Sequence, residues 1–144
     1  MKNLFLLLLL TINLGYSQTQ EEAIISLLEK ESSNWRSGDI EAHASCWSIK
    51  PYSRIFVSMA DGNSIDVPPI MMINPPKNMV GKGGTSKNSN YKMNIAENHA
   101  WVSHDEESTT ADGITSYTYE IRILEKIDGD WKLVGQSIHP RKTD

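Results

Sequence analysis

The last third of the chain contains strand-like segments separated by Asp-Gly turns. Residues 100–102, 117–124 and 131–134 are rich in β-branched and aromatic side chains, and Asp112-Gly113 and Asp128-Gly129 are typical of tight turns. Two shorter segments with helical spacing of apolar residues come before them. Helices followed by a long meander favour an α+β fold, in which a strongly curved antiparallel sheet wraps around N-terminal helices as a cone. We expect a pocket inside the cone.

The first 17 residues have the organisation of a secretory signal peptide. Lys2 provides a short basic region, residues 4–14 are mostly apolar, and Gly15 and Ser17 are the small residues expected before a cleavage site at Gln18. The alternatives are an N-terminal anchor or a buried core helix, but the apolar run is short for crossing a bilayer. We therefore expect export to the periplasm or the exterior.

Removal of residues 1–17 leaves residues 18–144, a length suited to a single domain. Without Lys2, 13 Lys and Arg residues stand against 18 Asp and Glu, a formal charge of −5. This balance argues against a nucleic-acid partner, which needs clustered basic residues. The single Cys46 cannot form an intramolecular disulfide. We expect no stable membrane association once the signal peptide is removed.

Capping residues bound two predicted helices. Thr19 and Glu22 form a capping-box signature, and Gly38 is placed to end the first helix. Asp39 is placed to cap a second helix over residues 40–47, before a proline. The middle of the chain has a less regular pattern, which predicts two short strands.

Residues 53–59 predict a strand, and residues 64–67 predict a short returning strand after a turn. Residues 68–89 contain two Pro-Pro pairs and a Gly-rich run at residues 81–84, so we expect a loop with one helical turn. A loop of this length is often a lid or a partner surface.

Two loop lengths at Asp128-Gly129 predict opposite faces for residues 117–124. A two-residue loop places Glu120 and Arg122 on the face of Leu133. A three-residue loop over residues 127–129 instead keeps that face apolar, and we favour it for this reason. It predicts the pairs Ile123–Leu133, Ile121–Gly135, Tyr119–Ser137 and Tyr117–His139. The inward residues are then Tyr117, Tyr119, Ile121, Ile123, Trp131 and Leu133.

The two preceding hairpins are registered in the same way. Two-residue loops at Glu97-Asn98 and at Asp112-Gly113 turn both His104 and Glu106 inward and put Trp101 on the outer face. The rival register buries Trp101 and exposes His104. The favoured pairs are Ile95–Ala100, Met93–Val102 and Tyr91–His104 in the first hairpin, and Val102–Ile123, His104–Ile121 and Glu106–Tyr119 in the second.

Three stretches together resemble a known group of domains. They are residues 34–42 (Asn-Trp-Arg-Ser-Gly-Asp-Ile-Glu-Ala), 99–102 (His-Ala-Trp-Val) and 128–134 (Asp-Gly-Asp-Trp-Lys-Leu-Val). Their order and spacing are similar to the SnoaL-like, ketosteroid-isomerase-like domains of the nuclear-transport-factor-2-like superfamily. The resemblance covers most of residues 19–139 and is weakest over residues 60–90. It implies an α+β cone with a pocket at its end, and frequently a homodimer through the outer sheet face.

The resemblance does not imply a reaction, because such domains include isomerases, dehydratases, cyclases and binding domains without chemistry. No Asp of this chain aligns with the acidic base of the ketosteroid isomerases. His43 stands where such domains often carry an apolar residue, and Ser137 stands where they often carry a histidine. Catalytic roles are therefore not carried over.

The predicted registers bring His104 and Glu106 to the inside of the cone. A histidine and a carboxylate in contact are the minimum for general acid–base chemistry, so these two are the candidate catalytic residues. The alternative is a polar pocket rim or a satisfied buried network. The candidate pocket residues around them are His43, Trp47, Tyr91, Tyr117, Tyr119, Ser137 and His139.

Other candidate sites are weaker. His99, His104, His139 and Glu106 do not stand at a recognised metal-ligand spacing, so we expect no metal and no cofactor. Cys46 is expected to be a small buried side chain. Met71, Met72 and Met79 would either line an adaptable apolar site or pack within the loop.

Three functions are consistent with these observations. The first is an exported domain that binds an unknown small molecule or serves as an accessory domain. The second is a small-molecule lyase, isomerase or hydrolase that uses the His–carboxylate pair. The third is a structural module that dimerises through the outer sheet face, with Trp101 included.

Overall fold

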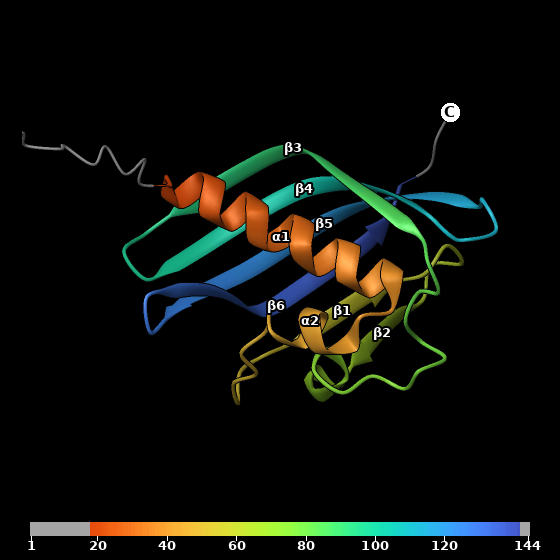
Figure 1. The fold of residues 1–144 in the computed structure, drawn as a ribbon, viewed down its shortest axis with the longest axis horizontal. Helices are drawn as coiled ribbons and strands as arrows, with labels where there is room; N and C mark the ends of the chain where they lie inside the picture. The colour runs from red at the N-terminus through yellow and green to blue at the C-terminus, as the bar shows by residue number, and fades with distance from the viewer. Residues whose placement is uncertain (1–17, 142–144) are drawn as a thin grey trace, which may run out of the picture.

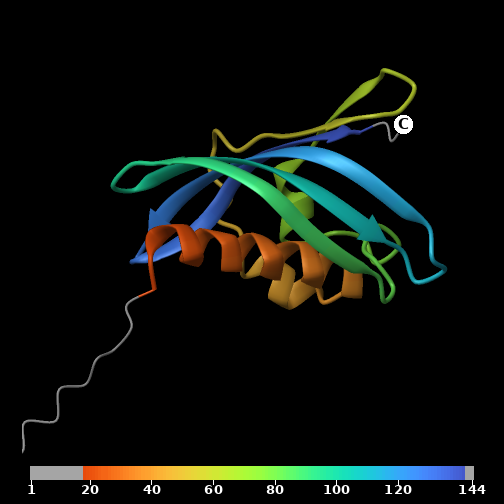
Figure 2. The same ribbon diagram turned by 90° about the horizontal axis from the view of Figure 1, so that it is seen from above.

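The structure is a computed structural model that describes residues 18–141. Helices α1 (Gln20–Ser37) and α2 (Ile40–Ala44) lie on the concave side of a six-stranded sheet (Figures 1 and 2). The strands are β1 (Ile55–Ser58), β2 (Ser64–Val67), β3 (Thr85–Ile95), β4 (His99–Thr109), β5 (Thr115–Ile127) and β6 (Asp130–Pro140). The predicted α+β cone is confirmed, whereas the predicted signal peptide at residues 1–17 lies outside the described residues.

The sheet has the strand order β2-β1-β6-β5-β4-β3. All neighbouring strands are antiparallel except β1 and β6, which pair in parallel through Ile55–Gln136 and Val57–Ile138. The sheet is therefore mixed, not wholly antiparallel as predicted. Since no hairpin joins β1 to β6, no tight turn forces these two strands to run in opposite directions. Among residues 18–141, no helix is both long and apolar enough to cross a membrane.

The predicted caps form as expected at both helices. The side chain of Thr19 accepts a hydrogen bond from the amide of Glu22, and the Glu22 carboxylate accepts one from the amide of Thr19. Gly38 ends α1 with φ 84°, and Asp39 accepts from the amide of Ala42 at the start of α2. These local signals fix where α1 begins and ends and where α2 begins.

Helix α2 ends at Ala44, three residues before the predicted end at Trp47. The chain leaves the helix to bond with β6: the amide of Leu133 donates to the carbonyl of Cys46, and the amide of Ser48 donates to the carbonyl of Leu133. The chain tightens before these tertiary hydrogen bonds form, since the amides of Cys46 and Trp47 donate to the carbonyls of His43 and Ala44, three residues earlier. The tertiary hydrogen bonds also hold the Trp47 side chain against the core.

The segment between β2 and β3 is shorter than the predicted loop over residues 68–89. It contains a 3₁₀ turn, η1 (Pro69–Met72), and β3 already begins at Thr85. The amides of Gly81 and Gly84 donate to the carbonyls of Trp35 and Arg36, so this segment caps the C-terminus of α1. Glycine is required at position 81, because an added Cβ atom would lie 2.0 Å from the Arg36 carbonyl oxygen.

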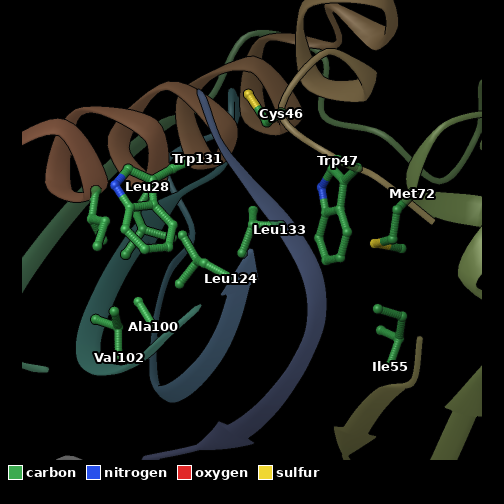
Figure 3. Packing of buried hydrophobic residues seen from close by; sticks show 11 residues of the cluster. Leu28, Cys46, Trp47, Ile55, Met72, Ala100, Val102, Leu124, Trp131 and Leu133 are labelled. Atoms are coloured by element: carbon green, nitrogen blue, oxygen red, sulfur yellow. The ribbon is translucent and has the colours of Figure 1, made fainter. Parts of the chain in front are cut away.

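The hydrophobic core lies between α1 and the concave face of the sheet (Figure 3). Leu28 of α1 packs in the same cluster as Leu124, Trp131 and Leu133 of the sheet. The predicted burial of Trp131 and Leu133 is confirmed, with exposed fractions of 6% and 0%. Trp47, Ile55 and Met72 extend the cluster toward β1.

The predicted register of the β5–β6 hairpin is wrong. Asp128 and Gly129 form a two-residue turn with φ values of 51° and 92°, a pairing that matches a type I′ turn. Leu124 lies opposite Leu133, and a bulge at Val134 then sets Ile123 opposite Gly135. Tyr119, Ile121 and Ile123 therefore point outward. Glu120, Arg122 and Leu124 point inward and are buried.

The two preceding hairpins are partly as predicted. The pairs Ile95–Ala100 and Met93–Val102 are confirmed. A bulge near Asn90 then shifts the register of β3 against β4. The centroids of the Tyr91 and His104 rings lie 5.5 Å apart. The β4–β5 connection is wrong by one residue, because the loop covers residues 110–114 instead of two residues. The actual pairs are Val102–Arg122, His104–Glu120 and Glu106–Thr118. His104 and Glu106 remain inward, and Trp101 lies outward as predicted.

Candidate active or binding site

An ionic cluster lies inside the cone, where polar groups are costly unless they are paired. Arg122 of β5 is its centre, with 3% of its surface exposed. Its guanidinium forms an ion pair with Glu31 of α1 at 3.3 Å and a close ion pair with Glu120 on its own strand. It also donates a hydrogen bond to the side chain of Gln136 on β6. One helix and two strands therefore converge on a single cation.

Glu31 connects this cluster to α2. Its Oε1 atom lies 2.9 Å from Nε2 of His43 and accepts a hydrogen bond of 3.2 Å from the Trp47 indole. Burial alone would raise the pKa of Glu31, but Arg122 and these hydrogen bonds outweigh it and lower the pKa to about 2. Because Glu31 carries no proton, the hydrogen on this contact belongs to His43 Nε2.

The two candidate catalytic residues have different partners. Glu106 binds Arg36 of α1 at 2.6 Å, whereas His104 lies 3.9 Å from Glu120 and packs against the Tyr91 ring. Burial, reinforced by the charge of Arg122, lowers the pKa of His104 to about 4. His104 is therefore neutral over the physiological range. His104 and Glu106 form neither an ion pair nor a hydrogen bond with each other.

Two further pKa values are displaced by burial. The pKa of the Glu120 carboxyl is raised, with the nearby Glu106 and Glu31 adding to the effect and Arg122 opposing it. The pKa of Tyr91 rises to about 12. The buried cluster thus contains one carboxyl whose pKa is lowered, Glu31, and one whose pKa is raised, Glu120.

A cavity of about 180 Å³ lies between α1, α2, the β1–β2 hairpin and the inner face of β5 and β6. One part of its wall is the ionic cluster, and the other part is apolar. The polar lining residues are Glu31, Ser32, Arg36, His43, Glu106, Glu120, Arg122 and Gln136. The remaining ones are Trp35, Ile55, Val57, Val67, Met72, Met79 and Ile138.

The predicted pocket residues divide into two groups. His43 lines the cavity, and Trp47 contacts the cavity residue Glu31. Tyr91 is half-buried beside His104. The other four lie on the outer face, contrary to prediction, because the β5–β6 register differs: they are Tyr117, Tyr119, Ser137 and His139. His139 there contacts the hydroxyls of Ser58 and Ser137.

Sequence reasoning missed the residues that form most of the charged wall. Glu31 falls at helical spacing with Ile24, Leu28 and Trp35, which is a signal for the buried face, whereas only the tertiary fold identifies Arg36. Glu120 and Arg122 did carry a signal, since they alternate with Leu124 on one face of the strand in the register that the Asp-Gly turn itself prefers. Of the loop methionines, Met72 and Met79 line the cavity.

Metal binding has no structural support within the described chain. Among residues 18–141, no three His, Cys, Asp or Glu side chains are grouped as a metal site requires. Cys46 is buried, with no disulfide partner, and burial raises the pKa of its thiol. The polar wall is thus built from guanidinium, carboxylate, imidazole and amide groups.

Comparison with known proteins identifies the fold. No family model matches the chain, and no curated protein matches it. An NTF2-like protein of unknown function from Shewanella baltica superposes with a TM-score of 0.64 at 17% identity, covering 85% of this chain and 94% of that one. A protein of unknown function with a cystatin-like fold from Nostoc punctiforme gives 0.66 at 12% identity, covering 88% and 96%.

A third solved structure bears the name of an enzyme. This proposed scytalone dehydratase from Novosphingobium aromaticivorans superposes with a TM-score of 0.61 at 16% identity, covering 86% of this chain and 85% of that one. At these identities the likeness shows the fold alone. The chain has the NTF2-like, cystatin-like fold, as the resemblance to SnoaL-like domains implies.

Proposed function

We propose that this NTF2-like-fold domain is an exported protein that binds a small organic molecule in the cavity between its helices and its sheet. The observation that carries the proposal is the division of the cavity wall into a buried ionic cluster and an apolar surface. Ligand sites are typically concave and mostly apolar, with a few polar groups that orient the ligand. Arg122 and Gln136 supply such groups on one side, and Ile55 and Val57 supply apolar contact on the other.

The size of the cavity limits the ligand. A dry engineered cavity of about 150 Å³ is sufficient to bind benzene. The cavity described here, at about 180 Å³, is of the same order. A ligand with one ring, or an aliphatic group of similar bulk, together with one polar group therefore matches it. A peptide or an oligonucleotide does not.

Benzyl alcohol is a suitable probe, because it combines one ring with one polar group. We expect it to shift the NMR signal of the Trp47 indole N–H, which donates to the cavity residue Glu31. The Trp131 indole donates to Gln20, which is not a lining residue, and should not respond.

A cavity-filling substitution provides the matched test. Val57→Phe places a ring into the cavity wall and should abolish the Trp47 response, whereas Ile123→Phe adds the same ring on the outer face and should preserve it. Saturable binding that survives Val57→Phe unchanged would place the ligand elsewhere and contradict the proposal. Thermal unfolding of both variants checks that each retains the fold.

Export rests on the sequence of residues 1–17 and is tested separately. Mass spectrometry of the periplasmic or secreted product should give an N-terminus near Gln18. An intact Met1 terminus in a cytoplasmic fraction would contradict export, and it would leave the cavity proposal unaffected.

A second candidate function is acid–base catalysis on the bound molecule. The observation that favours it is the 2.9 Å contact between His43 and Glu31 on the cavity wall, since a carboxylate that orients an imidazole is a recurrent catalytic arrangement. This pair replaces His104 and Glu106 as the histidine–carboxylate contact. Turnover that is lost in His43→Gln, while binding persists, would favour catalysis. Binding without turnover would favour the first proposal.

A further inference from the structure

We propose that the cavity selects a cationic ligand, a small primary amine that carries one apolar group. This inference rests on the proposed binding function and specifies its ligand class. It follows from the number and the pairing of the charged groups in the cavity wall, and from two acceptor atoms there that have no hydrogen-bond partner, His43 Nδ1 and Glu120 Oε2.

The cavity wall contains more carboxylates than guanidinium groups. Glu31, Glu106 and Glu120 are 4%, 2% and 2% exposed, so bulk water does not solvate their carboxylates. Arg36 is paired with Glu106, and Arg122 alone serves both Glu31 and Glu120. The three carboxylates therefore share two guanidinium groups, and besides Arg122 only the His43 ring contacts Glu31 as a potential cation.

The empty cavity can neutralise this excess with a proton. The charged or titratable groups that face Glu120 come from three elements: Arg122 on its own strand, His104 and Glu106 on β4, and Glu31 on α1. Thr118 donates a hydrogen bond to the Oε1 atom of Glu120. Strand β6 contributes only the uncharged Gln136. Burial lowers the pKa of His104 to about 4 and raises the pKa of Glu120. A proton taken up by the cluster therefore favours Glu120 over His104, and an ammonium group on a ligand can take the place of that proton.

His43 provides an independent indication of a donor-rich ligand. It is 1% exposed, lines the cavity, and has no hydrogen-bond partner at Nδ1. In the tautomer whose Nε2 donates to Glu31, Nδ1 carries no proton and is a free acceptor on the cavity wall. An ammonium group offers three donors and no acceptor, so it can satisfy both this nitrogen and a carboxylate.

The same wall disfavours an anionic ligand. Both guanidinium groups already bind carboxylates, and a further negative charge would meet Glu31, Glu106 and Glu120 at close range. The Nε atoms of Arg36 and Arg122 have no partner, but a neutral oxygen on the ligand is enough to satisfy them. The apolar wall around Met72, Met79 and Ile138 receives the apolar group of the amine.

Three probes of nearly equal size test the charge preference on the unmodified domain at neutral pH. Benzylamine is a cation, benzyl alcohol is neutral, and benzoate is an anion. We expect benzylamine to bind at least about tenfold more tightly than benzyl alcohol, and benzoate to bind most weakly. Calorimetry in two buffers of different ionisation enthalpy should show proton release with benzylamine and none with benzyl alcohol.

Glu120→Gln removes the excess acid while keeping a group that can accept from Arg122. It should reduce benzylamine affinity to the level of benzyl alcohol and abolish proton release. Glu107→Gln is the matched control, since it removes the same charge from an exposed position on β4 and should preserve the preference.

The outcomes separate the two proposals. Benzyl alcohol or benzoate binding as tightly as benzylamine would overturn the cation preference and leave the binding function intact. A full preference that persists in Glu120→Gln would also overturn it. Failure of all three probes to bind would overturn both proposals.

Discussion

At the residue scale, the charged side chains inside the cone form one buried cluster around Arg122. Arg122 joins a helix to two strands through ion pairs with Glu31 and Glu120 and a hydrogen bond to Gln136. Such a cluster is weak evidence for stability, because desolvation offsets much of the attraction. We propose instead that the cluster, which lines a cavity, serves ligand recognition.

Removing the central cation should destabilise the domain strongly. Arg122→Met leaves two carboxylates buried without their partner, which typically costs about 3–5 kcal/mol. Chemical denaturation at neutral pH measures the free energy of unfolding. Arg54→Met is the matched control, because the Arg54–Asp66 pair is exposed and should contribute less than about 1 kcal/mol. Equal effects of the two substitutions would contradict the burial of the cluster.

His104 should titrate with a midpoint near 4, well below its ordinary value of 6.5. The folded state keeps His104 neutral, whereas the unfolded chain takes up a proton below 6.5. Stability is therefore lost as the pH falls from 6.5 toward 4, by about 3 kcal/mol. NMR titration measures the midpoint. Because the Glu106 carboxylate raises the His104 pKa, Glu106→Gln should lower the midpoint further. An ordinary midpoint that Glu106→Gln leaves unchanged would contradict burial of His104.

Glu31 extends acid sensitivity to lower pH. Its folded-state pKa of about 2 lies below the ordinary 4.5, so its contribution to stability is present above 4.5 and is lost as the pH falls toward 2. Glu31→Gln should remove this part of the acid transition while leaving the part between 6.5 and 4. Unfolding curves collected across pH distinguish the two windows.

At the element scale, the β5–β6 hairpin sets which side chains enter the cone. Leu133 lies opposite Leu124 and is fully buried. Leu133→Ala should cost about 2–5 kcal/mol, as large core truncations do. Lys132→Ala is the control on the adjacent, partly exposed position and should change the free energy of unfolding little. A loss below about 0.5 kcal/mol for Leu133→Ala would contradict the register.

At the scale of the whole molecule, the outer face of the sheet remains partly apolar. Trp101 lies opposite Ile123 in the β4–β5 register, and they are 43% and 41% exposed, with Tyr119 52% exposed on the same face. Contiguous exposed apolar side chains of this kind mark interaction surfaces. We propose that this face pairs with a second copy of the chain.

Sedimentation of residues 18–144 tests this pairing. We expect a dimer that Trp101→Lys converts to a monomer, because the charged side chain would be desolvated between the two sheets. Ile114→Lys changes an equally apolar and 64% exposed residue in the β4–β5 loop, and should leave the dimer intact. A monomer for the unmodified domain at high concentration would refute the proposal.

The sequence by itself determined the features that depend on near neighbours in the chain. The caps at Thr19 and Gly38, the order of helices and strands, and the burial of Trp131 and Leu133 follow from capping groups, turn dipeptides and alternation. The outward position of Trp101 also follows, because the Glu97-Asn98 turn fixes the register of its hairpin. Each of these signals acts over a few residues.

Only the tertiary structure decided the site. An apolar inner face was the expectation for β5, yet the two-residue type I′ turn sets Leu124 opposite Leu133 and so turns Arg122 and Glu120 inward on the same face. Their burial is tolerable only because α1 crosses the sheet and brings Glu31 within 3.3 Å of Arg122. These residues are about 90 positions apart in the sequence, and no local pattern encodes their contact. The physical reason is that an ion pair is determined by the packing of whole elements, whereas a cap or a turn is determined by adjacent residues.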